Sequence, residues 1–291
     1  MSGDMIITGY GFLVGIAVLM AVLEMPREHG QNAALRLALP AIPLGLVFAR
    51  LLYVIFRLPF FLDFGLIHAF NVRAGGFLLY GALLGVLLAA CLVSRNTGTF
   101  KKTLDDLTCP GLLAIAICRF AEGTVGEGLG NWVEPGLAFF PLATPNPFGE
   151  YQWSIYLLEG ICALILFICL LRPRSGRFLI ALTVYAGCQI IFESLRMDSV
   201  LKIGFVRVSQ LLSAVCLLIL ALIQRGRGGN VKQTAIGGGI IILLSLGVAG
   251  LEWALEKTQV SNLLIYAVMI VLSLCMMVTV LGIRPGQKMK Q

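Results

Sequence analysis

Long apolar runs, separated by short polar connections, dominate the chain. A helix needs about 20 apolar residues to cross roughly 30 Å of hydrocarbon. About nine runs approach that length, namely 6–23, 37–56, 75–93, 107–120, 155–171, 178–193, 208–223, 234–251 and 261–283. The fourth and sixth runs are short. The pattern predicts an all-α polytopic membrane protein with about nine transmembrane helices.

The composition agrees with a membrane protein. Hydrophobic residues make up 58% of the chain and charged residues 13%, and the mean hydropathy is +0.92. About a quarter of the residues in a soluble domain are charged. The net charge of +7 could suggest a nucleic-acid partner, but the basic residues form short clusters between apolar runs. Such clusters are typical of orientation signals, so we expect no nucleic-acid partner.

The eight cysteines lie within or at the ends of apolar runs, without a paired CxxC spacing and without a neighbouring histidine. This placement is typical of small buried hydrophobic residues. We therefore expect no metal site and no cofactor.

The basic clusters also predict an orientation. If the N-terminus is outside, most of the 22 basic residues lie in the inner connections and the C-terminal tail. Cytoplasmic loops carry an excess of Lys and Arg, so the C-terminus would be cytoplasmic. Residues 121–154 contain no Lys or Arg but include Trp132 and Trp153, which predicts a small outer-face cap. Residues 57–74 mix aromatic and basic residues and are predicted to lie on the outer face.

Several charged residues fall at or near membrane depth, all in the outer half. An ionisable residue there costs a few kcal/mol on insertion scales, so it usually faces a protein interior or a wet cavity and marks a site. The residues are Arg50, Arg119, Glu127, Glu193 and Arg196. Arginine can hold a phosphate or carboxylate through paired hydrogen bonds, so three converging arginines would form an anion site. Two simpler interpretations stay open: Arg119 as an interfacial anchor, and Arg196 paired with Glu193 on one helix face.

Glycines inside the apolar runs predict close helix packing. They are Gly75, Gly76, Gly81, Gly85 and residues 237–239, and small residues let helix backbones approach each other. A phosphate-binding loop is the alternative, but that motif requires a strand before a helix, and no strand is predicted.

Six short segments carry a family resemblance. They are TGYGFLVGIA (8–17), ARLLYVIF (49–56), AGGFLLYGALLG (74–85), DLTCPGLLAIAICRFAEGTVGEGLG (106–130), FESLR (192–196) and SQLLS (209–213). In order and spacing they resemble the bacterial prolipoprotein diacylglyceryl transferase family across residues 1 to about 223. The resemblance implies a transferase-like seven-helix domain over 1–230, which includes the cap 121–154. Residues 231–291 would then be an additional two-helix membrane hairpin.

The chain departs from the family pattern at several positions. Tyr80 stands where the family has a histidine in its HGG motif. The asparagines of the family's GNFxN stretch fall on Glu122 and Val125. The HPxQLYE motif is reduced to YQWSIYLLE (151–159), which keeps Tyr156.

The resemblance implies an enzyme of the bacterial plasma membrane. It would transfer a diacylglyceryl group from phosphatidylglycerol to the lipobox cysteine thiol of a prolipoprotein, at the outer face. Its partners would be phosphatidylglycerol, the prolipoprotein signal peptide and membrane lipids. The implied catalytic residues are Arg119, Glu127, Arg196 and Tyr80, and the implied substrate-binding residues are Tyr10, Arg50, Glu193 and Gln210.

Alternatives remain for the proton acceptor and for the function. Tyr80 has an ordinary pKa of about 10, so it would need nearby arginines to lower that value. Glu127 or Glu122 could accept the proton instead, or the thiol could ionise in a positive field without a base. The chain could also be a lipid transferase with another acceptor, or a non-catalytic phospholipid-binding or transport protein. The clustering of polar groups at one face argues against a transporter.

Overall fold

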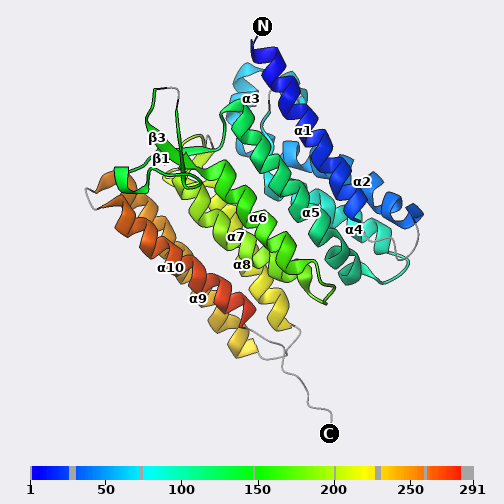
Figure 1. Cartoon of the computed structure of the whole chain (residues 1–291). Helices are drawn as coiled ribbons and strands as arrows, with labels where there is room; N and C mark the ends of the chain where they lie inside the picture. Colours follow the sequence, from blue (N-terminus) through cyan, green and yellow to red (C-terminus); the bar gives the residue numbers. More distant parts are fainter. Residues whose placement is uncertain are drawn as a thin grey trace. The chain divides into compact units, whose positions relative to one another are not determined.

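The computed structural model describes residues 2–25, 31–71, 75–146, 148–199, 201–226, 231–258 and 261–282. In these ranges, long helices occupy the nine predicted apolar runs (Figure 1). They are α1 (Ser2–Glu24), α2 (Gln31–Phe56), α4 (Leu79–Ser94), α5 (Phe100–Glu122), α6 (Ile155–Leu170), α7 (Arg177–Leu195), α8 (Val208–Gly226), α9 (Val231–Lys257) and α10 (Asn262–Leu281). The prediction of a helical membrane protein is confirmed at this level.

Several helix starts differ from the prediction, and α1 and α2 begin earlier than predicted, at Ser2 rather than at 6 and at Gln31 rather than at 37. Helix α5 begins at Phe100 rather than at 107, because its first turns carry charged residues that the apolar pattern does not count. Helix α4 begins at Leu79 rather than at 75. Gly75 and Gly76 have φ angles of 70° and 79°, a left-handed conformation that an α-helix does not accommodate.

The helices have the apolar character of a membrane protein. Within the described residues, four helical segments are long and apolar enough to cross a bilayer, and they are Leu35–Phe56, Arg177–Leu195, Val231–Lys257 and Asn262–Leu281. Shorter apolar helices are Gly9–Glu24, Leu79–Ser94, Ile155–Leu170 and Val208–Gln224. Large apolar side chains such as Leu39 and Leu243 are about 70% exposed, which suits contact with lipid.

The chain divides into two compact units. Unit 1 is formed by the described residues of 1–126 and 163–178, and unit 2 by those of 127–162 and 179–291. Helices α6 and α7 contribute residues to both units. The predicted domain boundary near residue 230 stays a prediction.

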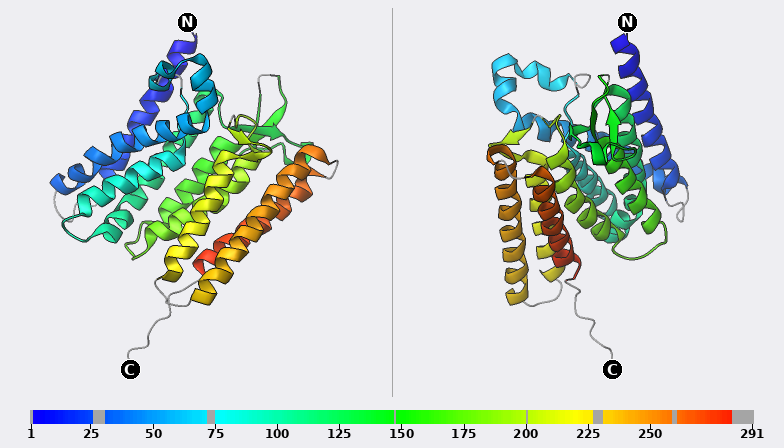
Figure 2. Two further views of the ribbon diagram at one scale, coloured as in Figure 1. Left: turned by 180° about the vertical axis from the view of Figure 1, so that it is seen from behind. Right: turned by 60° about the vertical axis from the view of Figure 1, so that its left-hand side comes forward.

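Unit 1 contains two closely packed helix pairs. Helix α1 packs on α5, and α2 packs on α4, as the two views in Figure 2 show for α2 and α4. A Cβ atom at Gly81 would collide with the carbonyl oxygen of Phe48, and one at Gly85 would collide with that of Leu44. The predicted role of Gly81 and Gly85 in helix packing is therefore confirmed, whereas Gly75 and Gly76 precede the helix.

The segment after α2 forms two short helices that the apolar pattern did not predict. They are α3 (Leu58–Phe64) and the 3₁₀ helix η1 (Leu66–Phe70). Ile67 and Phe70 are 75% and 81% exposed. Such exposure is compatible with the predicted location at a membrane surface.

Unit 2 begins with small sheets that the helical prediction missed. The cap holds an antiparallel sheet of β1 (Leu129–Trp132), β2 (Ala143–Pro145) and β3 (Tyr151–Ser154), in the order β1-β3-β2. Ala143 lies opposite Trp153, and Thr144 lies opposite Gln152. A second hairpin, β4 (Lys202–Ile203) and β5 (Val206–Arg207), directly precedes α8. Strands this short carry too few residues to show an alternating pattern.

The core of unit 2 is shared by α7, α8, α9 and α10. Ile190, Leu217, Ile241 and Met269 are at most 1% exposed and belong to one hydrophobic cluster. Helices α9 and α10 run side by side (Figure 1). The two C-terminal helices are therefore built into this core.

Candidate active site

Arg196 directly follows α7 and is held by two carboxylates of unit 2. Its Nε donates to Oδ1 of Asp198 at 2.9 Å, and Nη2 donates to Oδ2 at 3.3 Å. Its Nη1 lies 3.5 Å from Oε2 of Glu159, which is fully buried on α6. The Arg196 side chain is itself 11% exposed. A charge this deeply buried requires such partners, and the two-point contact with Asp198 fixes the plane of the guanidinium.

The backbone around Arg196 is joined to the start of the cap. Gly130 forms a β-bridge with Arg196, and the N–H of Gly128 donates to Oδ2 of Asp198 at 2.8 Å. A Cβ at position 130 would lie 2.6 Å from the carbonyl oxygen of Leu195 and 2.7 Å from Cβ of Trp153. Glycine is therefore required for this close approach. The last residues of the 106–130 motif thus meet the last residue of the FESLR motif.

Asp198 is an anion at neutral pH. Burial alone would raise the pKa of the Asp198 carboxyl group. The hydrogen bonds from Arg196, the positive charge of Arg196 and the hydrogen bond from the N–H of Gly128 outweigh this effect and lower the pKa. The Asp198 carboxylate therefore holds the Arg196 guanidinium electrostatically as well as geometrically.

Gln210 and Glu193, two further predicted residues, are buried in the same unit. Oε1 of Gln210 accepts from the N–H of Arg207 at 3.2 Å, and its Nε2 donates to the carbonyl oxygen of Ile190 at 3.1 Å. Glu193 accepts from the hydroxyl of Ser199 at 2.5 Å and from Nε2 of Gln189 at 3.5 Å.

Arg207 connects Gln210 to Arg196, because its Nη1 donates to the carbonyl oxygen of Arg196. Arg207 is 8% exposed. We call the set Glu159, Arg196, Asp198, Arg207 and Gln210 the Arg196 network. Glu127, at the start of unit 2, is exposed.

In unit 1, the N–H donors of the Arg50 guanidinium are bound by backbone carbonyl oxygens. Its acceptors are the carbonyl oxygens of His68, Ala69, Asn71, Gly75 and Gly76. An arginine side chain has five N–H donors, so each donor has a carbonyl to bind. This geometry favours a role in holding the connection between η1 and α4 over direct contact with a phosphate.

The other predicted residues of unit 1 lie on three helices. Arg119, in the last turn of α5, pairs with Glu122 at 2.5 Å, and both side chains are nearly buried. Tyr80 is buried in the first turn of α4, and Tyr10 is half-buried on α1. Arg119 belongs to unit 1 and Arg196 to unit 2, so the anion site predicted to be shared by them stays a prediction.

Three members of the Arg196 network were missed from the sequence, namely Glu159, Asp198 and Arg207. For Glu159 a signal was present, because it is the single charged residue in the apolar run 155–171, and such a residue marks a site by default. Asp198 and Arg207 lie in polar connections. Nothing in their local pattern distinguishes them from ordinary surface residues.

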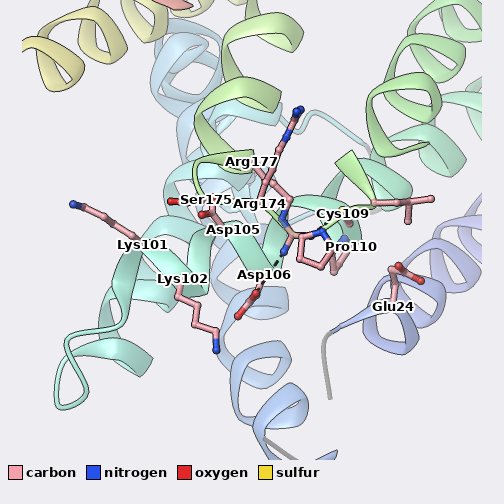
Figure 3. A pocket seen from close by; sticks show the side chains of 12 residues that line it. Glu24, Lys101, Lys102, Asp105, Asp106, Cys109, Pro110, Arg174, Ser175 and Arg177 are labelled. Atoms are coloured by element: carbon pink, nitrogen blue, oxygen red, sulfur yellow. Dashed lines mark hydrogen bonds and ion pairs between the residues drawn. The ribbon is translucent and has the colours of Figure 1, made fainter. Parts of the chain in front are cut away.

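Unit 1 also has a charged cavity of about 670 Å³ (Figure 3). Residues from the start of α5 and from the turn before α7 line it, including Lys101, Lys102, Asp106 and Arg177. Nη2 of Arg177 lies 3.6 Å from Oδ1 of Asp106. Asp105 accepts from the N–H groups of Gly176 and Phe178 at 2.8 and 2.9 Å. These contacts anchor the turn to α5, and the lining includes none of the predicted site residues.

Comparison with known proteins decides the family. The family model described as prolipoprotein diacylglyceryl transferase matches residues 1–224. The chain belongs to the prolipoprotein diacylglyceryl transferase family. It is accordingly an enzyme of lipoprotein biosynthesis and a multi-pass protein of the bacterial plasma membrane.

Curated members of the prolipoprotein diacylglyceryl transferase family are similar over most of their length. A phosphatidylglycerol–prolipoprotein diacylglyceryl transferase of Clostridium kluyveri is 30% identical over 250 residues, which cover 79% of this chain and 96% of the relative. Enzymes of the same name from Gloeobacter violaceus and Clostridioides difficile are 35% and 28% identical over 195 and 223 residues. These alignments cover 61% and 71% of this chain, and 69% and 85% of the relatives.

Proposed function

We propose that this chain transfers the diacylglyceryl group of phosphatidylglycerol to the lipobox cysteine thiol of a prolipoprotein. Membership of the family supports the proposal, and the relatives are named for the same donor and acceptor. The observation that carries it is Arg196, a nearly buried arginine oriented by Asp198 and Glu159. With nine spans and the N-terminus outside, this end of α7 would face the outer leaflet.

The reaction exchanges one bond at a glyceryl carbon. The cysteine thiolate attacks this carbon, the S–C bond forms, and the C–O bond to the phosphate breaks. Glycerol phosphate leaves with the electron pair, and the thiol proton passes to a base. Negative charge grows on the leaving oxygen, so a preorganised cation lowers the barrier.

The proposed roles follow from where the side chains lie. Arg196 and Arg119 would stabilise the phosphate. Asp198 and Glu159 would hold Arg196 in one orientation before the lipid binds, which reduces the reorganisation needed during the reaction. Arg50 would act indirectly, through the segment that its guanidinium holds.

The remaining predicted residues support the same reaction. Of the predicted catalytic residues, Tyr80 and Glu127 are the candidate proton acceptors, and Glu122, the alternative acceptor, pairs with Arg119. Tyr10, Glu193 and Gln210 would shape the binding site.

The experiment that tests the proposal is an assay with purified protein in liposomes that contain phosphatidylglycerol and a lipobox peptide. Mass spectrometry detects the diacylglyceryl thioether product. We expect product from the wild type and a loss of roughly 100-fold or more in Arg119→Ala and Arg196→Ala. Lys202→Ala is the matched control, since Lys202 is an exposed cation of unit 2, and it should retain full activity.

The variants Tyr80→Phe and Glu127→Gln separate the two candidate bases. A flattened dependence of rate on pH in one of them identifies the acceptor, whereas unchanged rates in both favour ionisation of the thiol without a base. Absence of product from the wild type contradicts the proposal. Binding of phosphatidylglycerol that still depends on Arg119 would then point to another acceptor or to a lipid-binding protein.

A further inference from the structure

Helices α9 and α10 lie beyond the part of the chain that the family model matches, yet they are packed tightly against α7 and α8. The hydroxyl of Ser273 on α10 donates to the carbonyl oxygen of Gly187 on α7 at 2.5 Å. A Cβ at Gly187 would lie 2.5 Å from Cγ of Met277. The packing of α10 on α7 therefore depends on direct contacts with the backbone of α7 at Gly187.

One buried acid of this hairpin, Glu252 on α9, contacts the Arg196 network. Glu252 is 4% exposed, and its Oε1 accepts a hydrogen bond from Nε2 of Gln210 at 2.6 Å. A carboxylate can only accept, so this contact turns the NH₂ group of Gln210 toward α9. The amide oxygen of Gln210 then faces the N–H of Arg207, which donates to it.

A series of hydrogen bonds leads from Gln210 through Arg207 to Arg196. The guanidinium of Arg207 donates to the carbonyl oxygen of Arg196, where the chain leaves α7. On α10, the hydroxyl of Tyr266 accepts from Nδ2 of Asn131 in β1 at 3.4 Å. Helix α9 therefore reaches the Arg196 network through Gln210, and α10 contacts Asn131, which follows Gly130, the β-bridge partner of Arg196.

We infer that Glu252 is a positioning residue for the transferase site, acting through Gln210 and Arg207 on Arg196. The inference rests on the proposed function. It gives the additional hairpin a part in the reaction, because α9 supplies one buried acceptor that fixes the Gln210 amide. Buried polar groups joined in this way depend on each other, and removing one leaves the next without its partner.

The test compares Glu252→Ala, Glu252→Gln and the matched control Glu256→Gln in the full-length protein. Glu256 lies on the same helix, is 42% exposed and pairs with Lys202 at 3.5 Å. We expect kcat to fall roughly tenfold in Glu252→Ala, with a smaller change in KM. Glu252→Gln keeps a carbonyl oxygen for Gln210 and should recover most of the rate. Glu256→Gln should match the wild type.

A second measurement separates this inference from the proposed function. Phenylglyoxal modifies accessible guanidinium groups, and mass spectrometry gives the rate at each arginine. We expect Arg207 and Arg196 to react faster in Glu252→Ala than in the wild type and in Glu256→Gln, with Arg36 as the exposed internal reference. Thermal unfolding in detergent is measured for every variant.

An unchanged kcat in folded Glu252→Ala together with unchanged labelling overturns the inference, whatever its melting temperature. A wild type without product overturns the proposed function instead. The labelling rates then still show whether Glu252 positions the two arginines.

Discussion

Arg50 of unit 1, which is buried, and Arg196 of unit 2, which is nearly buried, are two arginines with opposite surroundings. Arg50 binds neutral backbone carbonyls of one connection, so its charge serves to fold the chain. Arg196 is bound by side-chain carboxylates from α6 and from the residues after α7, so charged groups set the orientation of its guanidinium. The two arginines therefore share a predicted depth in the membrane but differ in their partners, and this difference is the basis of the different roles proposed for them.

The largest expected effect is on folding, in Arg50→Ala. Five carbonyls lose their guanidinium partner together, and a hydrogen bond to a charged group contributes about 1.5–3 kcal/mol to stability. We expect little folded protein in the membrane, measured by fluorescence-detected gel filtration. Arg36→Ala, an exposed position on the same helix, should accumulate normally. Normal accumulation of Arg50→Ala would remove the distinction between the two arginines.

The next effect is on catalysis, in Arg196→Lys. Lysine keeps the positive charge but cannot form the two-point contact with Asp198. We expect the rate of thioether formation to fall roughly 100-fold, with a much smaller change in melting temperature than in Arg50→Ala. A full rate in Arg196→Lys would show that charge alone is needed at this position.

A backbone test follows in Gly130→Ala. The added methyl group would collide with the carbonyl oxygen of Leu195 and with Trp153, at a cost of about 1–3 kcal/mol if the strand must shift. We expect a lower melting temperature and a reduced rate. Gly136→Ala is the control, since a Cβ there meets nothing within 4 Å. Equal behaviour of the two variants would contradict the close approach of β1 to Arg196.

The smallest effect is the contribution of Asp198 to stability as pH changes. Its pKa is lower in the folded protein than the usual value of about 3.9. A lowered carboxyl pKa stabilises the fold above the unfolded value, and this contribution is lost as the pH falls through the lower folded pKa. Melting temperatures between pH 3 and pH 7 should therefore depend less on pH in Asp198→Asn than in the wild type. Equal slopes would exclude the contact as a source of pH dependence.

The helices could be predicted from the sequence because a bilayer imposes one length and one apolar character on every crossing segment. That constraint acts locally, so each run can be recognised by itself, and in the described part of the chain a long helix covers most of each predicted run, although several ends differ. Segments that do not cross the bilayer were harder to predict from the sequence. The charged first turns of α5 and the short strands of the cap have no comparable local signature.

The family motifs led to Arg50, Arg119, Arg196 and Gln210, but sequence could not assign partners to them. Glu159 is 37 positions from Arg196 and Glu252 is 42 positions from Gln210, and contacts over such separations arise only when helices pack. Residue types are thus read directly from the sequence, and their depth in the membrane is predicted from it. Whether an arginine meets carbonyls or carboxylates was decided by tertiary structure, because a guanidinium can donate to either kind of oxygen.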